Sequence, residues 1–313
     1  MALDEHDLPG AKKQLKTMLE DITPLILTYN EAPNIGRTLE QLRWARDIVV
    51  VDSFSHDETL EIVSTFPQAR VVQRKFDNFA AQCNFGLTET NITSEWVLSL
   101  DADYELTTEL VTELAALEPD SDVAGFRARF IYCIFGRRLR SGIYPPVTVL
   151  FRRSQAMFNE DGHAHRVAVE GRVENLLAPI LHDDRKSLSR WLEAQSRYTR
   201  LEAEKLLSAR PEDLGWTDRI RCWRLVAPAA MLFYCLIVRG GLLDGWPGFY
   251  YAFQRSLAEL LLSLYLLDHD LRISEFGIRI SEFAEPQHSK LEVSEPGSLQ
   301  FEIRNPKSEI RNP

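Results

Sequence analysis

The sequence predicts an α/β fold, in which a mostly parallel sheet carries helices on both faces and a helical region follows. Between residues 22 and 103, short β-branched runs alternate with amphipathic stretches, as in parallel strands that are joined by crossover helices. The run from Ile48 to Val51 is continuously apolar, which is typical of a parallel strand buried on both faces. After residue 185 the apolar residues recur with helical spacing instead.

Strands and helices are expected to alternate along the amino-terminal half. The expected strands are residues 22–28, 47–52, 70–73 and 96–100, followed by 123–132 and 147–152 in a mixed segment. The expected helices are residues 34–42, 78–89 and 107–117, and a loop rich in acids and histidines is expected at 159–165. Ligands of such sheets bind at the carboxyl ends of the parallel strands. The residues that follow the first, second and fourth strands are therefore the first candidates for a site.

The region from residue 186 to 272 is expected to be helical and to contact a membrane. Residues 225–238 form an apolar run, which is too short to span a bilayer because spanning needs about 20 residues. The residues Arg219, Arg221, Trp223 and Arg224 precede this run, and a second apolar helix is expected at 257–267. This pattern favours an interfacial or re-entrant hairpin at an anionic membrane surface. A hairpin buried against the α/β domain is the alternative.

We expect four segments in the chain: a polar extension at 1–20, the α/β domain at 21–185, the helical region at 186–272 and a tail at 273–313. The tail repeats Ile-Ser-Glu-Phe and Glu-Ile-Arg-Asn-Pro without an apolar seam, so it is expected to be low-complexity and disordered. The first twenty residues lack the apolar core of a secretion signal. This predicts a cytoplasmic location, with the helical region at the inner face of the plasma membrane.

Composition and charge exclude several classes of protein. The 313 residues include 45% apolar and 26% charged residues, as in a folded globular chain. The formal net charge of −10 argues against a protein that coats nucleic acid, because phosphate binding needs an excess of Lys and Arg. The four cysteines lack the C-x-x-C spacing of a zinc or redox site. They are expected to be buried, reduced thiols.

Acidic side chains follow three of the expected strands. The Asp-x-Asp sequence of Asp101 and Asp103 comes directly after the fourth strand, Asp52 ends the second, and Glu31 follows the first. One carboxylate in such a rim can bind a divalent cation and another can bind sugar hydroxyls. A solvated turn or a helix cap is the structural alternative. Because like charges on one rim repel, a compensating cation or ligand is favoured.

These motifs together resemble the family 2 glycosyltransferases, which have the GT-A fold with its Rossmann-like sheet and transfer a sugar from a nucleoside diphosphate donor. The resemblance lies in residues 28–31, 50–53 and 100–103 and covers roughly residues 22–185. Residues 144–153, 180–182 and 241–245 are similar to stretches of bacterial lipopolysaccharide core glycosyltransferases. The resemblance implies a nucleotide sugar donor, and a saccharide or lipid-linked saccharide acceptor in the synthesis of cell-envelope polysaccharide or lipopolysaccharide.

The resemblance also implies a role for each site residue. The residues implied to bind the donor are Thr28, Tyr29, Asn30 and Glu31 at the nucleoside, Asp52 at the base, Lys75 and Gln82 nearby, and Asp101 at the ribose or sugar. Asp103 would hold a Mg²⁺ or Mn²⁺ ion, and His182 would complete the metal site. Helix capping by Thr28 and Asn30, a solvated Lys75 and a helix-terminal His182 are the structural alternatives.

The catalytic base is where the chain departs from its relatives. The relatives have a His-Glu pair ahead of a Val-x-Val-x-Gly stretch, which residues 167–171 match here, but the ungapped register places Ala164 and His165 at the pair. An inverting transfer needs a carboxylate or a neutral imidazole near the acceptor hydroxyl. We expect Asp161 to be the base, with His163 as the second candidate.

Two rival functions remain open, and Glu160 and His165 remain further candidates for the base. A sugar nucleotidyltransferase would need a glycine-rich phosphate loop after the first strand, and residues 28–33 contain no glycine. A non-catalytic, membrane-bound assembly factor that binds nucleotide sugars is favoured by the missing glutamate of the His-Glu pair.

Overall fold

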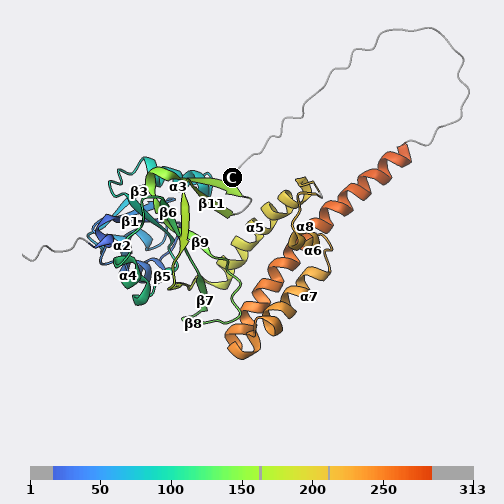
Figure 1. Cartoon of the computed structure of the whole chain (residues 1–313). Coiled ribbons are helices and arrows are strands. Elements are labelled where there is room, and N and C mark those ends of the chain that lie inside the picture. Colours follow the sequence, from blue (N-terminus) through green and yellow to red (C-terminus); the bar gives the residue numbers. More distant parts are fainter. Residues whose placement is uncertain (1–16, 162–163, 211, 284–313) are drawn as a thin grey trace, which may run out of the picture. The chain divides into compact units, whose positions relative to one another are not determined.

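The computed structural model of the chain describes residues 17–161, 164–210 and 212–283 (Figure 1). It divides into two compact units, with the boundary between His269 and Asp270. The first unit holds all the strands and all but the end of the last helix. Of the described residues, the second unit holds only the end of that helix.

A seven-stranded sheet forms the centre of the first unit, in the order β12-β6-β9-β4-β1-β2-β3. Its strands are β1 (Ile22–Thr28), β2 (Ile48–Asp52), β3 (Ala69–Gln73), β4 (Trp96–Asp101), β6 (Val123–Ala128), β9 (Val147–Arg152) and β12 (Arg172–Asn175). The strands β4, β1, β2 and β3 are mutually parallel, and β9 runs antiparallel to both of its neighbours. The predicted α/β fold with a mostly parallel sheet is confirmed.

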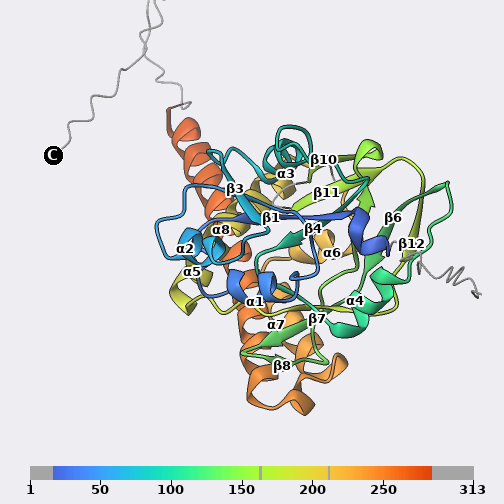
Figure 2. The same cartoon turned by 90° about the vertical axis from the view of Figure 1, so that its left-hand side faces the viewer.

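Helices cover both faces of this sheet (Figure 2). On one face, α1 (Ile35–Glu40), α2 (Thr59–Ser64) and α4 (Thr108–Ala115) bury Leu39 and Leu110 against the side chains of Ile26 and Val50. On the other face, α3 (Phe79–Thr88) packs on the intervening side chains of the same strands, which include Leu25. The central strands β1, β2 and β4 are mostly apolar because both of their faces are buried.

Two smaller sheets flank the central one. One has the order β5-β13-β7-β8, formed by β5 (Tyr104–Leu106), β13 (Ile180–His182), β7 (Phe130–Ile134) and β8 (Arg137–Arg138). The single strand expected at 123–132 is therefore wrong, because Arg129 separates β6 from β7.

The second small sheet is the hairpin of β10 (Ala156–Asp161) and β11 (Ala164–Val169). The loop expected at 159–165 is therefore also wrong. Its flanks pair as strands because Phe158, Val167 and Val169 pack against the α3 side of the core and give the hairpin one apolar face.

The helical region contains α5 (Leu188–Ser208), α6 (Trp216–Arg221), α7 (Val226–Phe233) and α8 (Trp246–Phe283). The apolar run at 225–238 forms α7 and a π-helical turn, Tyr234–Val238, and the apolar segment at 257–267 is the middle of α8. A 3-10 turn, Gly241–Asp244, connects the two. This connection is tight, because a side-chain carbon at Gly248 would collide with the backbone carbonyl of Gly241.

The prediction that the tail begins at residue 273 is wrong, because α8 continues to Phe283. No proline interrupts the chain between Pro247 and Pro286, so nothing stops the helix at residue 273. Within the amino-terminal extension, Met18–Asp21 form a 3-10 turn. The remaining parts of both terminal predictions, residues 1–16 and 284–313, lie outside the described residues.

Hydrogen bonds join the helical region to the loop after β8. The Asp244 Oδ2 atom accepts bonds from Arg140 N, Ser141 N and Ser141 Oγ at 2.9, 3.0 and 2.9 Å. The Ile143 N–H donates to the Tyr251 hydroxyl at 3.1 Å. Beneath these bonds, Leu139 packs with the buried Cys235. The α7–α8 hairpin is thus fixed to the α/β domain.

No helix in the described parts of the chain is both long enough and apolar enough to cross a bilayer. Three cysteines, Cys83, Cys133 and Cys235, are buried free thiols, as predicted. Cys222 is free but only half-buried, because it lies on the short connection between α6 and α7.

We expect Asp244→Ala to lower the free energy of unfolding by about 2 kcal/mol, because three donors lose their acceptor. Urea unfolding followed by circular dichroism measures the change. The matched control is Asp213→Ala, which removes an exposed carboxylate paired with Arg210. Equal stability of the two variants would show that Asp244 does not hold the hairpin in place.

Candidate active site

The carboxyl ends of β1, β2 and β4 meet at one rim, as the sequence predicts. In the parallel register, Thr28 is paired with Asp52 and Leu27 with Asp101. The acidic residues after β4 and the polar residues after β1 therefore lie together, although about seventy positions separate them in the sequence.

Asp52 is fully buried beneath this rim. Its carboxylate accepts hydrogen bonds from Thr28 Oγ1 at 2.9 Å, Ser55 N at 2.9 Å, Ser55 Oγ at 2.5 Å and Gln73 Nε2 at 3.2 Å. A nucleobase would reach Asp52 only if one of these partners moved. In the described conformation Asp52 shapes the loop after β2.

Hydrogen bonds to the residues that follow β2 fix the loop after β1. Asn30 has a left-handed backbone with a φ of 55°, and its Oδ1 atom accepts from His56 N at 2.7 Å. The Glu31 N–H donates to Thr59 Oγ1 at 2.7 Å. Neither Thr28 nor Asn30 caps α1, whose cap position is Asn34, so the capping alternative is wrong. Tyr29 is left 46% exposed at the rim.

Asp103 and His182 meet at the centre of the rim. Strand β13 lies between β5 and β7, and its last residue, His182, is paired with both Tyr104 and Tyr132. The His182 Nε2 atom lies 3.2 Å from Asp103 Oδ2, and both side chains are largely buried. His182 therefore ends a strand, so the alternative of a helix-terminal histidine is wrong.

Three tyrosine rings pack around His182. The ring centroids of Tyr104, Tyr132 and Tyr144 lie 5.2, 4.8 and 4.9 Å from that of His182. The hydroxyls of Tyr104 and Tyr144 lie 2.7 Å apart. Burial raises the pKa of Tyr144, and the charge of Asp101 adds to this effect. The imidazole is therefore held in one orientation by a neutral aromatic cage.

Lys186 compensates the charge of the rim. Its ammonium group lies 2.8 and 2.9 Å from the two carboxylate oxygens of Glu31. Burial alone would raise the pKa of Asp103, but His182 and Lys186 outweigh burial and lower it to about 2. Burial raises the pKa of Glu31 to about 7, against the opposing effect of Lys186. Asp103 is thus the carboxylate that stays charged.

The Asp103–His182 pair fits a divalent cation. Among the described residues, Asp103 Oδ1 and His182 Nδ1 are both buried without a hydrogen-bond partner. Carboxylate oxygen suits Mg²⁺ and Mn²⁺, and such ions commonly complete their shells with waters and substrate phosphates. No cluster of three or more ligating side chains occurs in the described parts of the chain. The protein would therefore supply only part of the shell.

The other predicted donor residues lie in different surroundings. Asp101 is half-buried at the end of β4. Gln82 is fully buried, and its amide donates to Ser53 Oγ at 2.9 Å, so it supports the loop after β2. Lys75 is exposed on the loop after β3.

Three of the four candidate bases, Glu160, Asp161 and His165, belong to the strands of the β10–β11 hairpin. The backbone pairs Glu160 with His165 and Asp161 with Ala164. His163 lies outside the described residues, as do the side chains of Glu160, Asp161 and His165. Their roles remain predictions.

Strand β10 of this hairpin is bonded to α3 through Asn84, a residue that the sequence did not single out. Asn84 of α3 both donates to and accepts from the backbone of Phe158, at 2.9 Å in each case. Asn84 was not predicted because a single asparagine inside a helical stretch does not indicate which backbone it will bind.

The contacts that residues 183–190 make with the rim were also not predicted, although His182, just before them, was. Asp184 Oδ1 accepts from Asn34 Nδ2 at 3.0 Å, and Arg190 donates to the Asn30 carbonyl at 2.7 Å. Lys186 and Arg190 flank the start of α5 and fold back onto the loop after β1. The only sequence signal was a basic cluster beside His182.

A small pocket opens beside Lys186. Its lining comes from the rim, β7 and helices α5 and α8, and includes Tyr132, Phe135, Asp184, Lys186, Trp191, Tyr250 and Gln254. Tyr132 belongs to both the pocket and the aromatic cage of His182. The pocket is therefore adjacent to the Asp103–His182 pair.

Sequence comparisons identify similar proteins. Residues 25–172 match the model of the family described as glycosyl transferase family 2. An uncharacterized glycosyltransferase of Rickettsia conorii is 34% identical over 100 residues, 32% of this chain and 34% of that protein. The lipopolysaccharide core biosynthesis glycosyltransferase LpsC of Rhizobium meliloti is 26% identical over 239 residues, 71% of this chain and 82% of that protein. The chain thus spans about a third of the Rickettsia relative and most of LpsC.

Comparison with solved structures finds distant similarity. The mannosyltransferase PcManGT from Pyrobaculum calidifontis, in complex with GDP-Man and Mn²⁺, has a TM-score of 0.45 and 17% identity, and the match covers 79% of this chain and 87% of that one. A fragment of S. aureus TarS in complex with UDP-GlcNAc has a TM-score of 0.41 and 17% identity, with 81% and 92% covered.

We expect Lys186→Met to lower the free energy of unfolding by about 2 kcal/mol, because it leaves buried carboxylates without their cation. The double variant Glu31→Gln with Lys186→Met should recover part of the loss. A double-mutant cycle from urea unfolding measures the coupling. The control cycle uses the exposed pair Glu40 and Arg43, whose coupling energy should be much smaller because solvent screens an exposed ion pair. If the two pairs had equal coupling energies, Lys186 would not be needed to compensate the negative charge of the rim.

Proposed function

Because residues 25–172 belong to glycosyl transferase family 2, we propose that this enzyme transfers a sugar from a nucleoside diphosphate to a saccharide or lipid-linked saccharide. One observation carries the proposal: a charged, buried Asp103 lies 3.2 Å from His182 at the carboxyl rim of a parallel sheet. Such a rim is where α/β folds bind their ligands. Tyr29 and Asn30 would line the nucleoside side of this site, and Asp101 would bind the sugar or ribose hydroxyls.

Leaving-group chemistry explains the charges of the site. As the bond to the sugar breaks, negative charge develops on the departing diphosphate. A Mg²⁺ or Mn²⁺ ion held by Asp103 and His182 would neutralise that charge when bound. His182, with a smaller contribution from Lys186, keeps Asp103 ionised, and the tyrosine cage keeps His182 oriented.

The acceptor would react in a single displacement that inverts the anomeric carbon. Its hydroxyl attacks that carbon while a base on the β10–β11 hairpin takes the proton, and we assign this role first to Asp161 and then to His163. The side chains around the small pocket beside Lys186, among them Trp191 and Gln254, are of the aromatic and polar kinds that bind saccharides, and we propose that the acceptor packs against them. Similarity to LpsC supports an acceptor of the lipopolysaccharide core type.

The acceptor's class suggests where the enzyme works. A saccharide destined for the cell envelope is built on a lipid carrier or lipid core, so we propose that the enzyme acts at the inner face of the plasma membrane. The exposed apolar side chains of the α7–α8 hairpin support this placement.

A non-catalytic role as a nucleotide-sugar-binding assembly factor is the second candidate. It is favoured by Ala164 and His165, which occupy the register of the relatives' His-Glu pair. Donor-dependent thermal stabilisation without release of nucleoside diphosphate would support it over the enzyme.

We expect purified protein to release nucleoside diphosphate from one member of a nucleotide sugar panel when Mn²⁺ and a lipid-extract acceptor are present. Asp103→Asn should reduce release at least a hundredfold, because it removes the charge that faces the cation and diphosphate. The control is Asp47→Asn, which changes a half-buried carboxylate paired with Arg70. Undiminished release by Asp103→Asn would overturn the metal assignment.

Asp161→Asn is expected to slow transfer between about a hundredfold and ten-thousandfold, because general-base catalysis is removed. Donor affinity, measured by calorimetry, should stay within a factor of two or so of wild type, since donor contacts are elsewhere. A full-rate Asp161→Asn enzyme would move the base to His163 or His165.

A further inference from the structure

Basic and acidic residues are segregated along this chain. Residues 123–159 contain no carboxylate, and residues 219–258 contain only one, Asp244. Both segments contain several arginines, whereas the whole chain has a formal net charge of −10. The first segment belongs to the α/β domain and the second to the helical hairpin.

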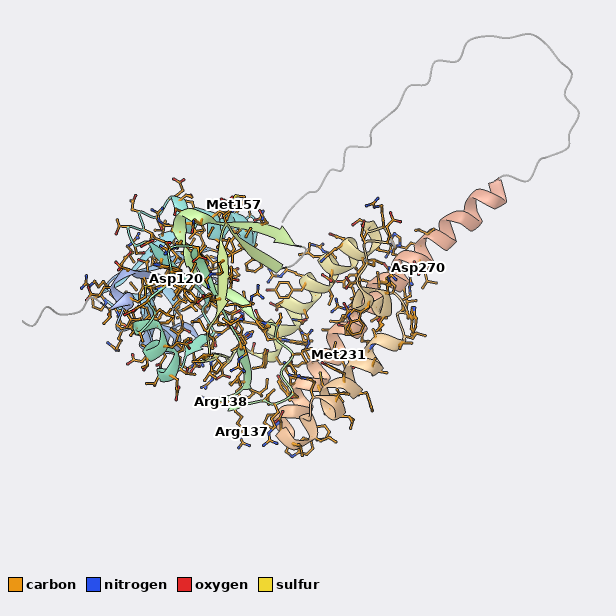
Figure 3. All side chains as sticks on the ribbon, in the orientation of Figure 1. Asp120, Arg137, Arg138, Met157, Met231 and Asp270 are labelled. Atoms are coloured by element: carbon orange, nitrogen blue, oxygen red, sulfur yellow. The ribbon has the colours of Figure 1, made fainter. Side chains whose placement is uncertain are left out.

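The structure joins parts of these two segments into one surface, which we call the tip and define as residues 135–140 and 233–246. They are connected by the bonds from Arg140 N and Ser141 to Asp244, and by a bond of 2.8 Å from Arg239 Nη2 to the Gly142 carbonyl. Figure 3 labels Arg137 and Arg138, which lie at the same end of the first unit as the turn between α7 and α8.

The tip carries exposed positive charge. Its four arginines, Arg137, Arg138, Arg140 and Arg239, are all exposed. Neither Arg137 nor Arg138 forms an ion pair with a carboxylate of the residues that the structure describes. The single carboxylate, Asp244, has three donors on one of its oxygens and is thereby compensated.

The same surface exposes large apolar side chains. Trp246 is 85% exposed, Leu243 74% and Phe135 69%. The other exposed large apolar residues of the tip are Phe233, Tyr234, Ile237, Val238 and Leu242. A monomer rarely exposes so many neighbouring large apolar residues unless the patch binds something.

We propose that the tip docks on an anionic phospholipid bilayer, with Trp246, Leu243 and Phe135 inserted at the interface and the arginines on the lipid phosphates. Tryptophan suits the bilayer interface, and basic residues are attracted to anionic headgroups. A second copy of the chain fits less well. A two-fold dimer through this surface would bring the arginines of both copies together with no free carboxylate of the tip to pair them.

This surface matches the one that the sequence suggested only in part: residues 233–246 belong to the expected hairpin, but the arginines of the tip do not come from the basic stretch before it. Arg221, in the basic stretch before α7, is engaged by Glu259 at 2.9 Å and by Glu202 at 3.2 Å. It therefore stabilises the packing of α5, α6 and α8 instead of facing lipid. The hairpin of β7 and β8, which supplies Phe135 and Arg137, had no membrane signal of its own.

Docking at the tip also orients the catalytic unit. Phe135 belongs to the tip and lines the pocket beside Lys186. A bilayer held at Phe135 would therefore lie at one side of that pocket, where the sugar of a lipid-borne acceptor could enter. This last step rests on the proposed function, whereas membrane docking itself does not.

The test is sedimentation of the full chain with vesicles, in the absence of any donor or acceptor. Wild type should bind vesicles of phosphatidylglycerol mixed with phosphatidylcholine, bind phosphatidylcholine alone more weakly, and be released by added salt. Arg137→Gln with Arg138→Gln should weaken binding to the mixed vesicles by roughly tenfold or more, because each basic residue at the surface contributes. Leu243→Ser with Trp246→Ser should weaken binding to both kinds of vesicle.

A matched control removes two arginines elsewhere. Arg43→Gln with Arg46→Gln has the same charge change on exposed residues between α1 and β2, and it should bind like wild type. Circular dichroism melts confirm that each variant is folded, and the arginine variants change only exposed side chains.

Three outcomes would overturn the proposal. The first is equal loss in the tip and control arginine variants. The second is a wild-type dimer in analytical ultracentrifugation that Leu243→Ser with Trp246→Ser dissociates. The third is binding that appears only after residues 284–313 are removed, which would make that segment the occupant of the tip. Because no sugar is transferred in this assay, failure of the proposed function leaves its result unaffected.

Discussion

The compensation of negative charge at the sheet rim is the constraint on which the site depends. The parallel register of β1, β2 and β4 places Asp52, Asp101 and Glu31 near one another, with Asp103 just beyond β4. Repulsion among these carboxylates would destabilise the folded chain unless cations or hydrogen-bond donors lie nearby. Asp52 is satisfied by hydrogen bonds, and Asp103 by His182 and Lys186. The return of the chain through β13 to α5 is thus required for the rim to hold its charge.

This constraint also explains why the rim could be predicted from the sequence while its partners could not. Strands β1, β2 and β4 are long apolar runs that end in polar residues, so both the sheet and its acidic edge follow from local pattern and parallel topology. The Asp101 and Asp103 pair was predicted from its position after the fourth strand, whereas His182 was named only through a family resemblance. The 3.2 Å separation of Asp103 and His182 results from the pairing of β13 with β5, each only three residues long. Strands this short leave no periodic signal.

The remaining errors have similar physical causes. Lys186 and Arg190 look like solvated charges beside a helix start, and only the tertiary fold returns them to Glu31 and Asn30. Residues 159–165 of the β10–β11 hairpin were predicted to form a loop because polar residues predominate there. The end of α8 was misplaced because a repeat in the sequence was taken for the end of the helix. The next proline after Pro247, which could end the helix, comes only at position 286. In each case contacts distant in sequence, or the absence of a breaker, outweighed composition.

The distribution of charge gives the tip a further property. A chain with a formal net charge of −10 is repelled overall by an anionic bilayer, yet repulsion and attraction are both screened within about 8 Å at physiological ionic strength. Only the surface in contact with the headgroups therefore determines binding, and every other surface that carries carboxylates disfavours contact. Positive charge without paired carboxylates, as at the tip, selects one orientation of an acidic protein on the membrane, since a rotated molecule would bring carboxylates to the lipid. Net acidity and local basicity are thus complementary: the first prevents binding in the wrong pose, and the second, with Trp246 and Leu243 beside it, permits binding in one.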